Sequence, residues 1–169
     1  MHETADDIRS LQMLIDESVE LAGPFLRHSF DMPALSLSAG QIIRRLEGSV
    51  TLALGTVTSD GRPRVAPVIA LFYRGQFFIP TVRTALRTRH VQNNAEVSLS
   101  LYEGNDFAII VHGQAVVIDS EHQVFDSLVN LQIEVGAGDV RTWGDAVFIK
   151  VDAERLYSFA RFPDQFPAS

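Results

Sequence analysis

The chain has 169 residues, and its formal net charge of −7 excludes a general nucleic-acid binder, because affinity for a phosphate backbone needs clustered positive charge. It has no cysteine, which excludes a disulfide framework and thiolate chemistry. No apolar run approaches the roughly 20 residues of a membrane span, and the acidic start lacks the order of a secretory signal, so we expect one globular domain in the cytoplasm.

The first predicted element is an amphipathic helix over residues 5–22, with apolar side chains at three- and four-residue spacing. Its stripe consists of Ile8, Leu11, Ile15 and Val19. Gly23 and Pro24 should end this helix, and residues 25–37 are expected to form an irregular connector. We assign residues 1–37 to an N-terminal helical extension.

A second helix is expected over residues 39–47. Ser38 and Gln41 have the spacing of a capping box, in which two side chains satisfy free amide groups at the helix start. Gly48 is a natural stop for this helix.

Two β-rich runs follow, over residues 51–58 and 64–72, and the turn sequence Ser-Asp-Gly-Arg separates them. An Asp-Gly pair is preferred where a turn needs positive φ, so the two runs should form an antiparallel hairpin. An Arg-Gly pair then reverses the chain into a third strand over residues 76–80.

A short basic helix should follow the third strand. Thr84 can cap it, with Arg83, Arg87 and Arg89 in and around its first turns. Six arginines gather within 28 residues: Arg62, Arg64, Arg74, Arg83, Arg87 and Arg89. A helix start with three guanidinium groups suits an anionic ligand, and a solvated basic face is the alternative interpretation.

Residues 97–102 alternate apolar and polar side chains, and a longer strand is expected over residues 107–118. Gly113 within that strand indicates a bulge or a close approach of another backbone. Ser120 and Gln123 repeat the capping-box spacing, so a helix should begin there.

The last two strands are expected over residues 146–151 and 155–160, joined by a turn at residues 152–153. Antiparallel strands with helices at their connections are most economical as a barrel, because closure removes exposed edges. The expected fold class is mainly β (α+β): a split antiparallel β-barrel with connecting helices and an N-terminal helix. The barrel domain should cover residues 38–161, followed by a tail over residues 162–169.

Several segments carry a family likeness: residues 55–57, 60–63, 65–68, Thr81, Arg87, Arg89, and residues 93–94, 97–99, 111–115 and 143–159. In order and spacing they resemble the FMN-binding split β-barrel family, which includes pyridoxamine 5'-phosphate oxidase and the deazaflavin-dependent oxidoreductases. The likeness spans residues 40–160. The ordered set carries it, because no single motif in it is diagnostic.

The resemblance implies FMN as the cofactor, bound at the interface of a homodimer. In relatives the phosphate is bound just after the third strand and by a basic residue of the next helix, positions that fall on Thr81 and Arg87. The second strand borders the flavin ring at residues 66–69. The candidate cofactor-binding residues are Ala66, Pro67, Val68, Ile69, Pro80, Thr81, Arg83, Thr84, Arg87 and Phe159.

Three of these candidates also have an interpretation that involves no ligand. Pro67 lacks an amide hydrogen, so it fits a barrel strand only where the ladder is interrupted, either by a ligand or at an edge or bulge. Arg87 can bind two phosphate oxygens with its planar fork, or it can be a surface arginine. Phe159 aligns with an aromatic that abuts the flavin in the pyridoxamine phosphate oxidases, and a core position is the alternative.

The chain also departs from those oxidases. Ala66 stands where they have an arginine, and Ala85 stands where many relatives have serine or threonine. Arg83 and Thr84 can compensate for these changes. Residues 159–163 replace the Arg-Leu-His type stretch that holds pyridoxamine phosphate. We therefore do not expect authentic pyridoxamine 5'-phosphate oxidation.

The leading interpretation is a pyridoxamine 5'-phosphate oxidase-related, FMN-dependent oxidoreductase acting on a small organic substrate, with no nucleic-acid or membrane partner. One alternative uses the deazaflavin coenzyme (F-420), whose acidic tail suits Arg62, Arg64 and Arg89. Another is a flavin- or haem-binding protein without turnover. The histidines have no metal-ligand spacing, so we expect no metal site and interpret His112 as structural or pocket-lining.

Overall fold

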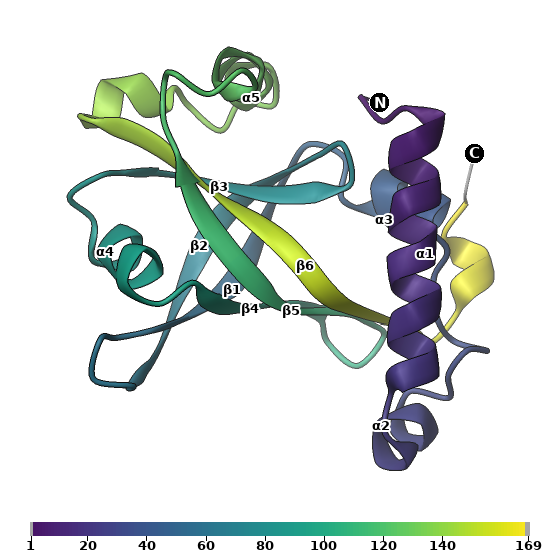
Figure 1. Ribbon diagram of the computed structural model, residues 1–169. Coiled ribbons are helices and arrows are strands. Elements are labelled where there is room, and N and C mark those ends of the chain that lie inside the picture. The colour runs from purple at the N-terminus through teal and green to yellow at the C-terminus, as the bar shows by residue number, and fades with distance from the viewer. Residues whose placement is uncertain (1, 168–169) are drawn as a thin grey trace.

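A computed structural model describes residues 2–167, which fold as a six-stranded antiparallel β-barrel (Figure 1). The strands are β1 (Ser49–Val57), β2 (Pro63–Tyr73), β3 (Gln76–Val82), β4 (Glu96–Glu103), β5 (Phe107–Ile118) and β6 (Ala146–Ala160). Their order around the barrel is β1-β2-β3-β6-β5-β4, and pairing of β4 with β1 closes it. The expected fold class is confirmed.

Five α-helices and two short 3-10 helices connect or flank these strands. They are α1 (Ala5–Leu21), α2 (Pro24–Ser29), α3 (Ala39–Arg45), α4 (Leu86–Asn93), α5 (Phe125–Glu134), η1 (Val140–Trp143) and η2 (Pro163–Gln165). The capping box of Ser38 and Gln41 is present at the start of α3, as expected. None of the helices in residues 2–167 is long and apolar enough to cross a membrane.

The N-terminal helix α1 packs into the same core as the barrel. Leu11 and Ile15 are buried with the inward-facing side chains of the strands. Two polar side chains of α1 fix it in place. The Ser18 hydroxyl accepts a hydrogen bond from the Leu156 backbone N–H at 2.9 Å, and the Gln12 amide oxygen accepts one from the Ala39 N–H at 2.8 Å. The segment outside the family-like region is therefore part of the barrel's structure.

A second, smaller core lies on the outer side of the barrel, under α5. Phe125 and Leu128 of α5 pack with Leu71 of β2, Phe78 of β3 and Phe148 of β6. Figure 1 shows α5 above the barrel on the side away from α2. The connection between β5 and β6, which contains α5 and which we call the excursion, is thus packed onto the strands through its apolar face.

The structure tests two expectations about strand β6 and its neighbour β5, a turn in β6 and a bulge in β5. The expected turn at residues 152–153 is wrong, because β6 runs unbroken for 15 residues. A β-bulge absorbs the irregularity instead: His112 pairs with Arg155, whereas Gly113 pairs with Ala153. The expected bulge at Gly113 is confirmed, and a Cβ added there would lie only 2.2 Å from the carbonyl oxygen of Asp152.

Three local expectations were wrong. The connector after Gly23 begins with the short helix α2, whose first position is a proline, a residue well suited to N1. Ala85, not Thr84, is the N-cap of α4. The helix expected from Ser120 begins at Phe125, because residues 119–124 form turns around the Asp119 side chain, which accepts the Glu121 N–H at 3.2 Å.

Candidate functional site

β2 and β3 are paired over only part of their length, and we call the unpaired region between them the opening. β2 pairs with β1 along residues 63–71, but it pairs with β3 only at residues 71–73. Leu71 pairs with Phe78, so an unbroken ladder would also pair Val68 with Thr81. That pairing is missing, which leaves residues 63–70 of β2 with an open edge beside β3. Backbone donors and acceptors along such an edge can bind a ligand in place of a strand.

The predicted ring-bordering residues lie on this open edge. Val68 points inward and is buried, whereas Pro67 and Ile69 are exposed on the outer face and Ala66 is half-buried. Pro67 sits opposite Ala53 of β1. β2 has no β3 partner at Pro67, which is compatible with both the ligand and the strand-edge interpretation of this proline.

Pro80 and Thr81 line the other side of the opening, on β3. Both are buried, and they pair with β6 only, Thr81 opposite Val147. Only 4% of Thr81 is exposed, yet its hydroxyl makes no hydrogen bond with any described residue. The Thr81 oxygen is not fully buried, because Ser36 Oγ is the one buried side-chain polar atom without a partner among the described residues. The Thr81 hydroxyl is therefore accessible and available to hydrogen-bond a ligand at the opening.

Arg87 lies in the first turn of α4 and is half-buried. Its guanidinium makes no ion pair or side-chain hydrogen bond within residues 2–167. The half-buried Arg45 is different, because it pairs with Glu103. No described carboxylate neutralises this guanidinium, so Arg87 is a natural position for an external anion. The hydroxyl of Thr88, which donates to the Val82 carbonyl at 2.8 Å, fixes the start of this helix against β3.

Arg83 is engaged within the protein. Its Nε donates to Asp145 Oδ2 at 2.9 Å and its Nη2 to Asp119 Oδ2 at 3.1 Å. The hydrogen bond that Arg83 donates to Asp119, followed by the one it donates to Asp145, raises the pKa of Arg83. The Glu121 backbone N–H, and then Arg83, lower the pKa of Asp119. We call Arg83, Asp119 and Asp145 the arginine clamp. It joins the end of β3 to both ends of the excursion between β5 and β6.

The other candidates are placed less favourably within one chain. Thr84 is exposed, and its carbonyl accepts from Arg89 Nη2 at 3.3 Å. Phe159 packs against Phe30, with ring centroids 5.6 Å apart. It lies 13 residues along β6 from Ala146, which pairs with Val82, a separation of roughly 40 Å of strand. A single chain therefore does not bring Phe159 to the opening.

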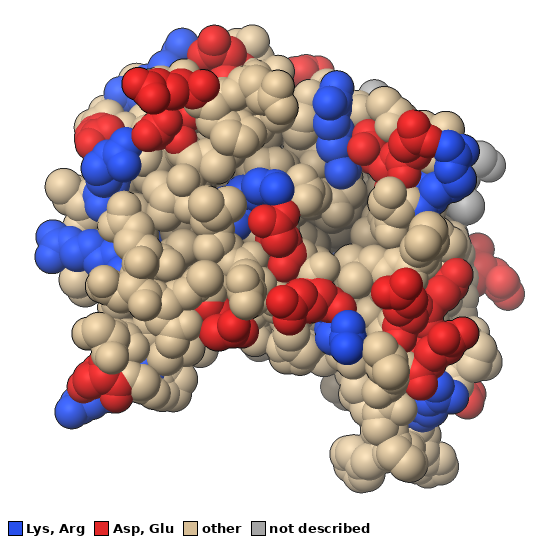
Figure 2. Space-filling model, viewed as in Figure 1, with Lys and Arg blue, Asp and Glu red and all other residues tan. Residues whose placement is uncertain are grey.

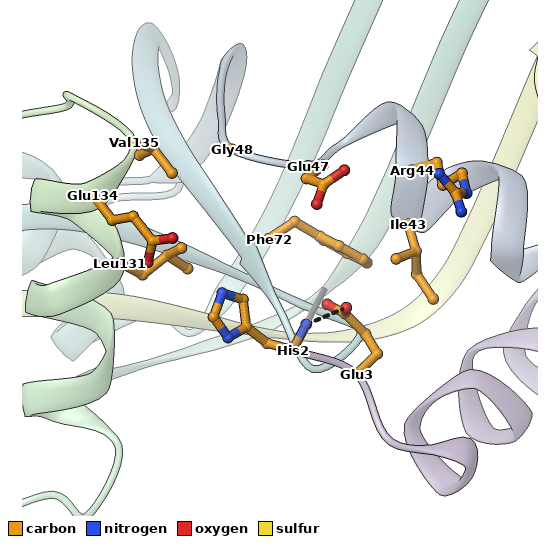
Figure 3. Close-up of a pocket in the computed structure, with 10 residues that line it drawn as sticks. All are labelled: His2, Glu3, Ile43, Arg44, Glu47, Gly48, Phe72, Leu131, Glu134 and Val135. Atoms are coloured by element: carbon orange, nitrogen blue, oxygen red, sulfur yellow. Dashed lines mark hydrogen bonds between the residues drawn. The ribbon is translucent and has the colours of Figure 1, made fainter. Parts of the chain in front are cut away.

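Two hollows lie elsewhere. A cavity of about 190 Å³ lies between the N-terminal segment, α3 and α5 (Figure 3). Its lining includes the carboxylates of Glu3, Glu47 and Glu134, which do not favour an anionic ligand. A larger groove of about 570 Å³ follows α1 along β3 and β6. Neither includes a candidate cofactor residue.

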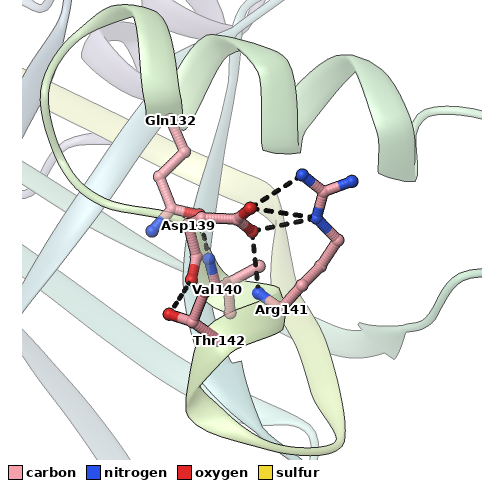
Figure 4. A network of polar contacts seen from close by, with 5 residues as sticks. All are labelled: Gln132, Asp139, Val140, Arg141 and Thr142. Atoms are coloured by element: carbon pink, nitrogen blue, oxygen red, sulfur yellow. Dashed lines mark hydrogen bonds and ion pairs between the residues drawn. The ribbon is translucent and has the colours of Figure 1, made fainter.

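The sequence interpretation missed one polar network, at η1 (Figure 4). The Asp139 carboxylate accepts from Arg141 Nη2 at 2.7 Å, and this pairing lowers the pKa of Asp139. The fully buried Gln132 side chain accepts from the Val140 N–H at 3.1 Å and donates to the Ala137 carbonyl at 3.1 Å. The network fixes the path from α5 to the clamp residue Asp145. In the sequence, the two-residue spacing of Asp139 and Arg141 was the signal for this ion pair.

No group of three or more histidines, aspartates or glutamates suited to a metal ion occurs within residues 2–167. His112 is exposed on the outer face of β5, where its Nδ1 lies 2.8 Å from the Ser98 hydroxyl.

The chain is similar to one known protein family and to several solved structures. The family model described as pyridoxamine 5'-phosphate oxidase matches residues 40–160. No curated protein matches the chain. Among solved structures, a conserved hypothetical protein from Mycobacterium tuberculosis superposes with a TM-score of 0.65 at 18% identity, over 80% of this chain and 92% of that one.

Two further solved structures have names that mention a cofactor. An F420 reductase superposes with a TM-score of 0.54 at 17% identity, over 68% of this chain and 94% of that one. A pyridoxamine 5'-phosphate oxidase-related, FMN-binding protein from Nostoc punctiforme superposes with a TM-score of 0.51 at 12% identity, over 65% of this chain and 74% of that one. At these identities the likeness shows a shared fold.

Proposed function

The chain belongs to the pyridoxamine 5'-phosphate oxidase family, and we propose that it is an FMN-dependent oxidoreductase acting on a small organic substrate. The opening between β2 and β3 carries this proposal, because the residues beside it suit the parts of a flavin nucleotide. Flavin-type cofactors in the names of proteins with the same fold support the choice of ligand.

The phosphate end of the cofactor would meet Arg87 and Thr81. Arg87 offers a guanidinium without an ion pair among the described residues, and Thr81 offers a hydroxyl that makes no hydrogen bond within them. Arg83 contributes little positive charge, because two carboxylates already neutralise it. Ala66 adds no charge either. We therefore expect Arg87 to supply most of the electrostatic attraction for the phosphate.

The ring end would lie along the open edge of β2. Unpaired backbone groups there can hydrogen-bond the polar edge of a flat ring, and Pro67, which has no amide hydrogen, costs no hydrogen bond at that edge. When bound, a flavin supplies hydride and electron transfer, and the protein contributes binding, orientation and shielding from water. The lack of an evident acid–base pair beside the opening is consistent with that division of roles.

A second copy of the chain would complete the site. Val65 and Ile69, on the outer face of β2, are 73% and 41% exposed, which together with the exposed Pro67 between them makes an apolar face on this strand. Figure 2 shows the surface hollowed between two projections, where Figure 1 places the β1–β2 turn and α2. A homodimer formed through the outer face of β2 would cover both residues.

The visible spectrum of the purified protein, followed by titration of the apoprotein with FMN, tests the proposal. We expect a flavin spectrum or saturable FMN binding, with turnover of a small electron acceptor or donor. A deazaflavin spectrum would instead favour the coenzyme F420, for which the exposed Arg64, which has no ion pair among the described residues, is suited. FMN binding without turnover would favour a non-catalytic flavin protein, and a haem spectrum would favour haem binding. Failure to bind FMN below about 100 μM, a free energy of only about −5.5 kcal/mol, would refute the proposal.

A further inference from the structure

Arg155 is a second half-buried arginine without a carboxylate partner. Among residues 2–167, four arginines are half-buried: Arg45, Arg83, Arg87 and Arg155. Arg45 and Arg83 pair with carboxylates, whereas Arg87 and Arg155 do not. The one side-chain hydrogen bond of Arg155 goes to the carbonyl of its neighbour Glu154, at 2.6 Å. The Arg155 guanidinium is therefore not neutralised within the described residues and remains able to bind an external anion.

His112 lies beside Arg155 on the adjacent strand. The two residues are register partners of β5 and β6, and both face outward, because Val111 and Leu156 beside them are buried inside the barrel. Directly opposite side chains in an antiparallel pair have Cβ atoms about 4.5–5.5 Å apart. The imidazole and the guanidinium therefore start from neighbouring points on one face.

The imidazole is held in a defined orientation. Its Nδ1 lies 2.8 Å from the hydroxyl of Ser98, the register partner of His112 on β4. Its ring makes an edge-to-face contact with Tyr157, with centroids 6.4 Å apart. When the Ser98 hydroxyl donates to Nδ1, the hydrogen of the neutral ring is on Nε2, which then becomes a donor directed away from Ser98.

Two of the three carboxylates near the cluster have partners of their own. Glu96, two residues before Ser98, accepts from the Gln114 amide at 3.1 Å. Asp152 pairs with Lys150 at 2.7 Å. Glu154 precedes Arg155 on β6 and is exposed. None of the three forms an ion pair with Arg155.

From this arrangement we infer that Ser98, His112 and Arg155 form an oxyanion site, which binds the carboxylate or phosphate group of a small molecule. Arg155 supplies a charged fork and His112 a single oriented donor, and Ser98 positions the imidazole. The cluster uses none of the residues assigned to the flavin site, although Ser98 pairs with Gly55 of β1, next to the Thr56 that contacts His90 of α4. Its role as the anion pocket for the substrate rests on the proposed function, whereas anion binding itself does not.

Titration of the flavin-free protein with inorganic phosphate, and separately with acetate, tests the site. The readouts are calorimetry and the NMR signals of the His112 ring. We expect saturable binding near the millimolar range, about −4 kcal/mol, with shifts concentrated at His112. The tighter of the two probes identifies the group as phosphate or carboxylate. No saturable binding of either probe, or shifts that bypass His112, would overturn the inference.

Variants separate this site from the fold and from the flavin site. Arg155→Gln should weaken the better probe at least tenfold, Arg155→Lys should weaken it less, and Ser98→Ala should weaken it severalfold by freeing the imidazole. Arg161→Gln is the matched control, because it removes the same charge from an exposed arginine paired with Asp106. Equal losses for Arg155→Gln and Arg161→Gln would contradict a specific site. FMN titration of the same variants reports separately on the proposed function.

Discussion

Replacement of Arg87 by alanine is the sharpest test of the flavin site. The guanidinium is half-buried and unpaired in the structure, so its removal breaks no internal ion pair and should leave stability nearly unchanged. A hydrogen bond to a charged group contributes about 1.5–3 kcal/mol. Loss of that contact should therefore raise the dissociation constant of FMN by roughly 10- to 150-fold.

The assay compares two ligands and two proteins. FMN and riboflavin are titrated into wild-type protein and Arg87→Ala, with flavin fluorescence as the readout. Riboflavin lacks the phosphate, so its affinity should be the same for both proteins, while that of FMN falls. Arg9→Ala is the control for net charge, because Arg9 is exposed on α1, where it pairs with Asp6. Equal weakening of FMN and riboflavin, or unchanged FMN affinity, would refute the assignment of Arg87 to the phosphate.

Three further predictions concern the scaffold around the opening. Gly113→Ala should destabilise the protein by at least about 1–3 kcal/mol in urea unfolding, because the new Cβ would meet the Asp152 backbone at 2.2 Å, and a loss below about 0.5 kcal/mol would contradict the tight bulge. Ser18→Ala should cost about 1–3 kcal/mol, because it leaves the buried N–H of Leu156 without an acceptor; an unchanged midpoint would show that another group replaces it. Asp119→Asn should lower the melting temperature at neutral pH. The pKa of Asp119 is lowered from 3.8 in the folded protein, so its carboxylate stabilises the fold only while it is ionised. The difference in melting temperature from wild type should therefore shrink as pH falls below 3.8. A difference that stays constant down to pH 2 would argue against this ionic contribution.

Local rules predicted most of the barrel. The turn between β1 and β2 follows from Asp60 and Gly61, and Gly61 indeed adopts a φ of 81°. The bulge at Gly113 follows from a glycine within a long alternating strand. In both places the residue type is dictated by backbone conformation within a few positions. Neighbouring residues in the sequence were therefore sufficient evidence.

Which arginines pair with carboxylates of the protein and which do not was not predictable in this way. Arg83 and Arg87 are four residues apart, and the sequence interpretation gave both to the ligand. The partners that neutralise Arg83 lie 36 and 62 residues away, at Asp119 and Asp145. They meet Arg83 only because α5 packs on the barrel and returns the chain to β6 at the end of β3. Such a contact depends on tertiary packing and leaves no local pattern.

The same comparison explains why exposure alone does not identify the functional arginines. Arg83 and Arg87 are both half-buried residues, so exposure does not distinguish them. Arg83 pairs with two aspartates, so an added anion would meet their negative charge. Arg87 pairs with no described carboxylate, so an added anion would meet no opposing charge of this kind. The difference between the two arginines therefore lies in their partners, which only the folded chain brings together.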